Sequence, residues 1–105
     1  MKKMQILVSK MVEDYSLEIS PEMRFIDLTS EVGELGKDIL KGNSYGKRQC
    51  EKTMNFEDEI GDVLFSLICI ANTMEVDLES SLNHTLAKYK KRFEEKSNTG
   101  SENNV

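Results

Sequence analysis

The chain has 105 residues, enough for one domain with a single hydrophobic core. Its 14 Lys and Arg residues are outnumbered by 19 Asp and Glu residues, so the formal net charge is −5 and the pI is about 4.9. Duplex nucleic acid is therefore not expected as a partner, because binding to the phosphate backbone requires a basic surface. No apolar run approaches the roughly 20 residues that cross a bilayer, so no membrane partner is expected either.

Helical periodicity runs along nearly the whole chain, and no strand-like alternation of useful length interrupts it. A first helix is expected over residues 4–15. Ser20 and Pro21 predict an N-cap and a first helical position, and Gly42 is placed to end that second helix.

The second half of the chain predicts two more helices. The third is expected from about Asn55 to Met74, after an irregular stretch over residues 42–54, and Asp77 is expected to cap the fourth. The sequence therefore predicts an all-α fold similar to a four-helix bundle. One domain is expected over residues 1–96, followed by a disordered polar tail over residues 97–105.

The two cysteines, Cys50 and Cys69, match no zinc or redox spacing. Cys69 lies in an apolar run, as a structural thiol would. Two reduced thiols are typical of a cytoplasmic protein, so a cytoplasmic location is expected.

Two acidic motifs carry most of the functional information, Glu31-x-x-Glu34 in the second helix and Glu59-x-x-Asp62 in the third. Carboxylates three residues apart on a helix project side by side. Four carboxylates from two helices supply the oxygen ligands that a hard divalent cation prefers, so the motifs predict a Mg²⁺ site in which Mn²⁺ could substitute. The simpler interpretation of either pair alone is a solvated helix surface.

The acidic motifs lie in different surroundings on their two helices. Asp27 and Asp38 share the flank of the second helix that carries the two glutamates, so they form an acidic ridge with them. The third helix has a narrow polar strip on an otherwise apolar surface, formed by Glu59, Asp62, Ser66 and Thr73. A helix that is so apolar should be buried on more than one side. We therefore expect it to lie centrally and to be covered in part by another subunit, in a homodimer or homotetramer.

The segments LTSEVGELGK (28–37) and EIGDVLF (59–65) resemble the MazG-like nucleotide pyrophosphohydrolases of the all-α NTP pyrophosphatase superfamily. The resemblance continues through IAN (70–72), VDLE (76–79) and KYKKR (88–92). It implies an all-α fold that oligomerises, and Mg²⁺-dependent hydrolysis of NTPs or dNTPs to a nucleoside monophosphate and pyrophosphate. Carried over by motif, the metal ligands would be Glu31, Glu34, Glu59 and Asp62.

The chain departs from the family pattern in two respects. Glu75 stands where relatives often have glycine, so the turn between the third and fourth helices is expected to differ. Tryptophan is absent, so stacking on a base would use Tyr45, Phe65, Tyr89 or another ring.

Cleavage of the α–β phosphate bond requires charge neutralisation, an activated water and in-line positioning. Glu34 lies furthest from the apolar stripe and is our candidate for the general base. The family motif Lys-Tyr-x-x-Arg makes Lys88, Tyr89 and Arg92 candidates for substrate binding. For each of the two cations, a solvated basic helix end is the simpler interpretation. Asn72 could pair with a base or cap nearby backbone.

Two other functions stay open at this stage. One is a non-enzymatic helical adaptor, whose apolar third helix serves association only. The other is a narrower pyrophosphohydrolase acting on dUTP, dCTP or a phosphoribosyl nucleotide. A di-iron bundle fits poorly, because the only histidine, His84, lies outside the acidic motifs.

Overall fold

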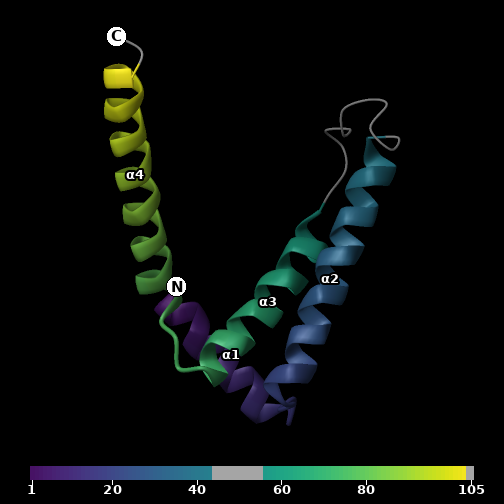
Figure 1. Ribbon diagram of the computed structural model, residues 1–105. Coiled ribbons are helices and arrows are strands. Elements are labelled where there is room, and N and C mark those ends of the chain that lie inside the picture. Colours follow the sequence, from purple (N-terminus) through teal and green to yellow (C-terminus); the bar gives the residue numbers. More distant parts are fainter. Residues whose placement is uncertain (44–55, 104–105) are drawn as a thin grey trace.

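The described residues of the computed structural model form four helices (Figure 1). They are α1 (Lys2–Asp14), α2 (Pro21–Gly42), α3 (Glu57–Thr73) and α4 (Leu78–Asn103). The structure describes residues 1–43 and 56–103, with side chains up to residue 96, and no strand occurs within these ranges. The prediction of an all-α fold is confirmed. Tyr45, Cys50 and nearly all of the irregular stretch expected over residues 42–54 lie outside the described residues.

The predicted helix starts are confirmed by their caps. Ser20 Oγ accepts a hydrogen bond from the Met23 backbone N–H at 3.2 Å, and Pro21 occupies the first helical position. Asp77 Oδ1 accepts from the Ser80 backbone N–H at 3.0 Å, so it caps α4 as expected.

The turn that ends α3 contains a residue in the left-handed region. Glu75 has a φ of 56°, and the next amide, Val76 N–H, donates to the Ala71 carbonyl at 2.8 Å. This is the pattern of a helix end that glycine normally occupies. The turn therefore forms without glycine, at an expected conformational cost of about 1–2 kcal/mol.

A polar clamp joins α1 to the α3–α4 turn. The buried Gln5 side chain donates to Asn72 Oδ1 at 3.0 Å and to the Val76 carbonyl at 2.8 Å, and it accepts from the Leu78 N–H at 2.9 Å. Asn72 Nδ2 in turn donates to the Gln5 carbonyl at 3.0 Å. Such bonds contribute about 0.5–1.5 kcal/mol each, so the clamp supports α1 where the apolar core is thin.

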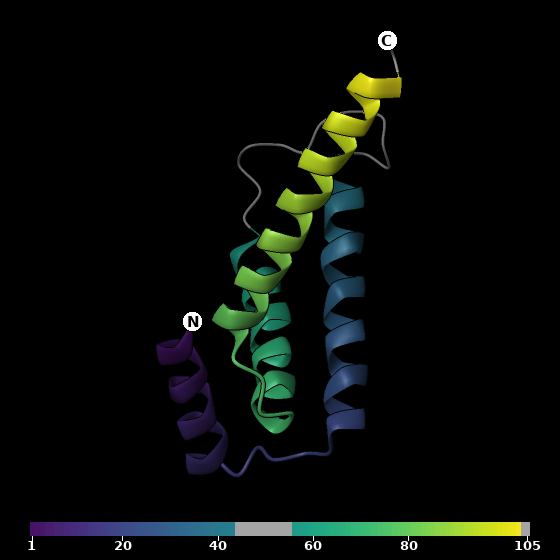
Figure 2. The ribbon, with the colours of Figure 1, turned by 60° about the vertical axis from the view of Figure 1, so that its left-hand side comes forward.

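Helix α3 is the central element of the packed part. It runs antiparallel to α2 and lies beside it, with α1 against another side (Figures 1 and 2). The buried apolar residues of the described chain all belong to α3: Ile68, Cys69 and Ala71. The expectation that the third helix lies centrally is therefore confirmed.

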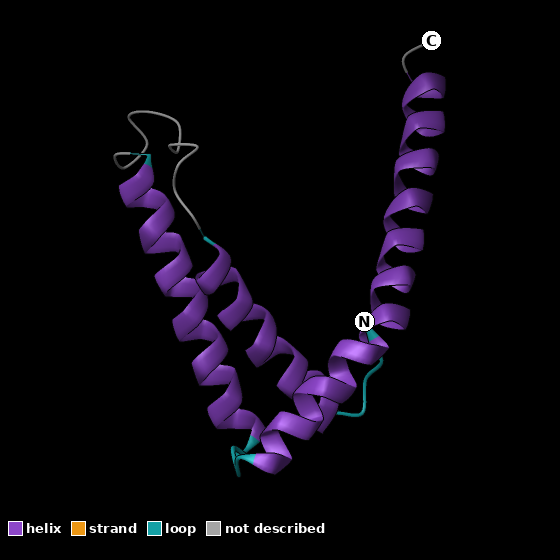
Figure 3. Ribbon diagram, turned by 180° about the vertical axis from the view of Figure 1, so that it is seen from behind, coloured by secondary structure: helices purple, strands orange, loops and turns teal. Residues whose placement is uncertain are grey.

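Helix α4 diverges from the other three helices and leaves the bundle open in a single chain (Figures 1 and 3). The Cα radius of gyration is 18.6 Å, whereas a compact chain of this length has about 13 Å. The helix also continues to Asn103, into the segment for which the sequence predicts a disordered tail. Among the described residues, no helix combines the length and apolar character needed to cross a membrane.

The left-handed turn gives a stability prediction. Replacing Glu75 by glycine should relieve the strained backbone and raise the melting temperature by about 4–8 °C, the shift expected for roughly 1 kcal/mol in a domain of this size. Thermal unfolding followed by circular dichroism measures the change. Glu94→Gly, in the exposed interior of α4, is the control and should lower the melting temperature. A lower melting temperature for Glu75→Gly would contradict the assigned turn.

Candidate active site

Two carboxyl groups meet where α2 and α3 pack together. The hydrogen bond between Asp38 and Glu59 raises the pKa of the Glu59 carboxyl above its usual value, and desolvation and the charges of Asp38 and Asp58 act in the same direction. The second oxygen, Glu59 Oε2, is buried and has no hydrogen-bond partner within the described part of the chain. Asp38 was placed on the acidic ridge by its spacing, but its contact with Glu59 was not predicted.

This contact fixes the register of the two antiparallel helices. Because each residue advances about 1.5 Å along a helix, moving one turn along from Asp38 and Glu59 brings Glu34 level with Asp62. One further turn along α2, Glu31 lies level with Ser66 of α3. The two acidic motifs therefore follow the same seam, which we call the acid seam (Glu31, Glu34, Asp38, Glu59 and Asp62). Glu31 and Glu59 are half-buried, whereas Glu34 and Asp62 are exposed.

The carboxylates of the acid seam are ligands of the type that a hard cation prefers, but within one chain they do not form a coordination cage. Among the described residues, no group of three or more His, Cys, Asp or Glu is placed to hold a metal ion. The four predicted ligands thus share a seam without converging. The donors are all carboxylate oxygens, and the unpartnered Glu59 Oε2 is available to a cation, so the residues present fit Mg²⁺ in type.

The predicted substrate residues on α4 form a cluster of their own. Lys88 Nζ lies 5.3 Å and Arg92 Cζ 5.8 Å from the centroid of the Tyr89 ring, both within the range of cation–π attraction. All three side chains are exposed and lie on the diverging part of α4. Within the described residues, no hydrogen bond or ion pair links them to the acid seam of their own chain.

The structure also shows where the other residues singled out in the sequence lie, namely Asn72, Phe65 and His84. Both ends of the Asn72 amide bond to Gln5, which favours a role in anchoring backbone and leaves base recognition a prediction. Phe65 packs under the Arg24 guanidinium, with 5.7 Å from Arg24 Cζ to the ring centroid. His84 is exposed on α4.

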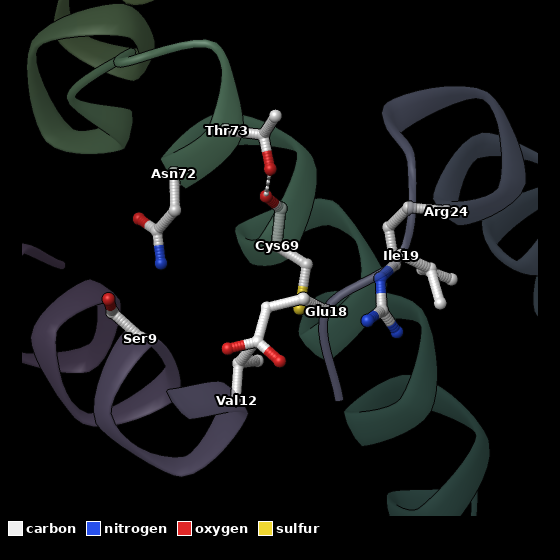
Figure 4. Close-up of a pocket in the computed structure, with 8 residues that line it drawn as sticks. All are labelled: Ser9, Val12, Glu18, Ile19, Arg24, Cys69, Asn72 and Thr73. Atoms are coloured by element: carbon white, nitrogen blue, oxygen red, sulfur yellow. Dashed lines mark hydrogen bonds between the residues drawn. The ribbon is translucent and has the colours of Figure 1, made fainter. Parts of the chain in front are cut away.

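A polar cavity of about 220 Å³ lies between α1, the connection over residues 15–20, and the adjoining ends of α2 and α3 (Figure 4). Its polar lining comprises Ser9, Glu18, Arg24, Cys69, Asn72 and Thr73. The sequence did not predict this cavity. The signs in the sequence were Asn72, a candidate for pairing with a base, and Thr73 at the end of the polar strip on α3.

The fold and the acid seam define an all-α protein with paired carboxylates on adjacent antiparallel helices. Residues 20–96 match the MazG nucleotide pyrophosphohydrolase domain, so the chain belongs to the MazG nucleotide pyrophosphohydrolase family. This membership supports a nucleotide pyrophosphohydrolase as the class of enzyme.

Individual relatives agree with the family. The uncharacterized protein YpjD of Bacillus subtilis (strain 168) is 37% identical over 76 residues, which span 70% of this chain and 67% of that protein. The crystal structure of YpjD from Bacillus subtilis, described as a proposed pyrophosphatase, matches with a TM-score of 0.70 at 33% identity over 85% of this chain and 91% of that one. A Bacillus-conserved MazG protein, described as a nucleotide pyrophosphohydrolase, matches with a TM-score of 0.68 at 34% identity over 84% and 86%.

The Asp38–Glu59 contact predicts a pH-dependent stability. Since the folded state raises the pKa of Glu59, the favourable contribution of its proton is present at low pH and is lost as the pH rises through the folded pKa. Without divalent cations, Glu59→Gln should therefore raise the melting temperature at neutral pH and have little effect in acid. Calorimetry at both pH values tests this, with Glu94→Gln on exposed α4 as the control. An equal effect of Glu59→Gln at both pH values would count against the contact.

Proposed function

We propose that the chain is a Mg²⁺-dependent nucleotide pyrophosphohydrolase, which cleaves the α–β phosphate bond of NTPs or dNTPs to a nucleoside monophosphate and pyrophosphate. The observation that carries this proposal is the acid seam, where the two acidic motifs follow one seam between antiparallel helices, with Glu34 level with Asp62, and Glu59 keeps a buried oxygen without a partner in the described part of the chain. The family supports the reaction class, and so does the structural relative described as a nucleotide pyrophosphohydrolase.

Glu31, Glu34, Glu59 and Asp62 are the residues that would hold the metal, Mg²⁺ or in its place Mn²⁺. The bound metal would neutralise phosphate charge and lower the pKa of a water. Asp38 would position the Glu59 carboxyl group beside it and leave Oε2, which has no partner in the described part of the chain, for the metal.

Glu34 is the proposed general base. It is more exposed than Glu31 or Glu59, and this leaves an oxygen free to accept the proton of the attacking water. Lys88 and Arg92 would stabilise the negative charge of the leaving pyrophosphate, with Arg92 able to donate two parallel hydrogen bonds.

We further infer that the working form is a homodimer or homotetramer. The accessible surface is 8482 Å², whereas a compact monomer of this mass exposes about 6,000 Å², so each chain has an excess on the order of 2,500 Å². An excess of this size is in the range of obligate interfaces. Along α4, an apolar stripe is exposed by about half or more: Leu82 54%, Leu86 56%, Tyr89 48% and Phe93 71%.

A second copy packed on this stripe would also explain the position of the substrate residues. The Lys88–Tyr89–Arg92 cluster belongs to α4, which diverges from α2 and α3 (Figure 1), so we place it at the seam of a neighbouring copy. The same exposed apolar surface is what an adaptor would use, and that function is the competing proposal. A preference for dUTP, dCTP or a phosphoribosyl nucleotide would be a narrower form of the same reaction. A cytoplasmic location stays a prediction.

Pyrophosphate release tests the reaction. The wild-type protein should release pyrophosphate from a panel of NTPs and dNTPs with Mg²⁺ and stop when EDTA is added. Glu34→Gln should lower kcat by about 10²–10⁴, the usual contribution of a general base. Glu22→Gln, an exposed carboxylate in the first turn of α2, is the matched control and should keep full activity. No release from any nucleotide by a folded, oligomeric protein would favour the adaptor.

The assembly has a separate test. Light scattering after size-exclusion chromatography should give a multiple of the 12.0 kDa chain mass. Leu86→Glu places a charge in the middle of the α4 stripe and should shift the mass toward one chain. His84→Glu lies 200° round the same helix and should leave the assembly intact. A wild-type protein of one chain mass would refute the inferred assembly.

A further inference from the structure

On both α2 and α3, the helix face that carries the acid seam continues to residues that line the polar cavity. On α3, Asp62, Cys69 and Thr73 lie seven and four residues apart, which are two turns and one turn of the same helix face. On α2, Arg24 precedes Glu31 by seven residues and shares its face in the same way. The cavity lining therefore begins about 10 Å along the helices from Glu31 and Asp62, and about 15 Å from Glu34 and Glu59. A ribose and its phosphates can bridge a separation of this size.

The cavity presents a fixed cation inside it. The Arg24 side chain is only 12% exposed, its Nη2 donates to the Leu17 carbonyl at 2.7 Å, and its guanidinium lies over Phe65. Its Nη1 lies 3.9 Å from Asp27 Oδ2 at the surface. A guanidinium has five N–H groups, so donors remain for a ligand.

An acceptor and two apolar walls complete the lining. Figure 4 shows the Glu18 carboxylate and the Arg24 guanidinium among the residues around one hollow. No ion pair joins these two groups in the part of the chain that the structure describes, so neither charge is neutralised by the other. Val12 and Ile19 supply apolar surface beside them. A flat heterocycle with polar edges is the kind of ligand that such a lining accepts.

We propose that this cavity binds the base of the substrate and selects a lactam edge, in which a carbonyl stands beside a ring N–H, as in guanine, hypoxanthine and uracil. Arg24 donates to the carbonyl and Glu18 accepts from the N–H, while the phosphates extend along the seam to the carboxylates. Adenine and cytosine lack the lactam N–H and leave Glu18 without a donor from the ring. This assignment rests on the proposed function and adds the determinant of its base preference.

The kinetic test compares kcat/KM for GTP, ITP and UTP with that for ATP and CTP. The wild-type protein should favour the lactam group, and Glu18→Gln should reduce that preference about tenfold through KM rather than kcat, the effect expected when one hydrogen bond to a charged group is lost. Glu13→Gln, an exposed carboxylate on α1 outside the cavity lining, should leave the preference unchanged. Unchanged ratios in Glu18→Gln would overturn the proposal and leave the pyrophosphohydrolase activity standing.

A binding measurement decides the proposal without catalysis. Calorimetric titration with GMP and AMP in the absence of divalent cations should show tighter binding of GMP, weakened in Glu18→Gln and in Arg24→Lys. Arg24 anchors the connection over residues 15–20, so Arg24→Lys could disturb folding. In that case Glu18→Gln alone decides the test, because Glu18 is exposed. Equal binding of the two nucleotides, or no binding, overturns the base site. Absence of pyrophosphate release together with preferential GMP binding would instead refute the proposed reaction alone.

Discussion

The antiparallel contact between α2 and α3 is the constraint on which the rest of the structure depends. It sets Asp38 against Glu59, fixes the register that aligns the two acidic motifs, and leaves one Glu59 oxygen buried without a partner. A like-charge contact of this kind opposes folding at neutral pH, and a bound cation would remove the opposition. In the proposed function, the feature that weakens the isolated fold is thus the one that would hold the metal.

The open shape of the chain follows from how little core it has. Among the described residues, only α3 supplies buried apolar side chains, while α4 exposes its apolar stripe to solvent. The Gln5 clamp holds α1 and the α3–α4 turn together with hydrogen bonds where apolar packing is sparse. The inferred assembly would do two things at once: it would cover the stripe, and it would bring the cations of α4 to the acid seam of a neighbouring chain.

Much of the local structure could be predicted from the sequence, because it depends on local chemistry. Ser20 and Asp77 satisfy the first amides of their helices, and the largely apolar surface of the helix expected from about Asn55 to Met74 correctly indicated a central helix. The Asp38–Glu59 contact could not be predicted, since it depends on the register between two helices rather than on spacing within one. The cavity escaped prediction for a similar reason: its walls come from three helices and one connection. The divergence of α4 could not be predicted either, because helical periodicity within one helix does not encode the angle between helices.

The most direct test of the central claim is to follow hydrolysis in oxygen-18 water and to locate the label in the products by mass spectrometry. Attack by an activated water at the α-phosphorus, beside the carboxylates of α2 and α3, would place the label in the nucleoside monophosphate and leave pyrophosphate unlabelled. Label in pyrophosphate would contradict attack at the α-phosphorus, and release of inorganic phosphate in place of pyrophosphate would contradict the proposed reaction.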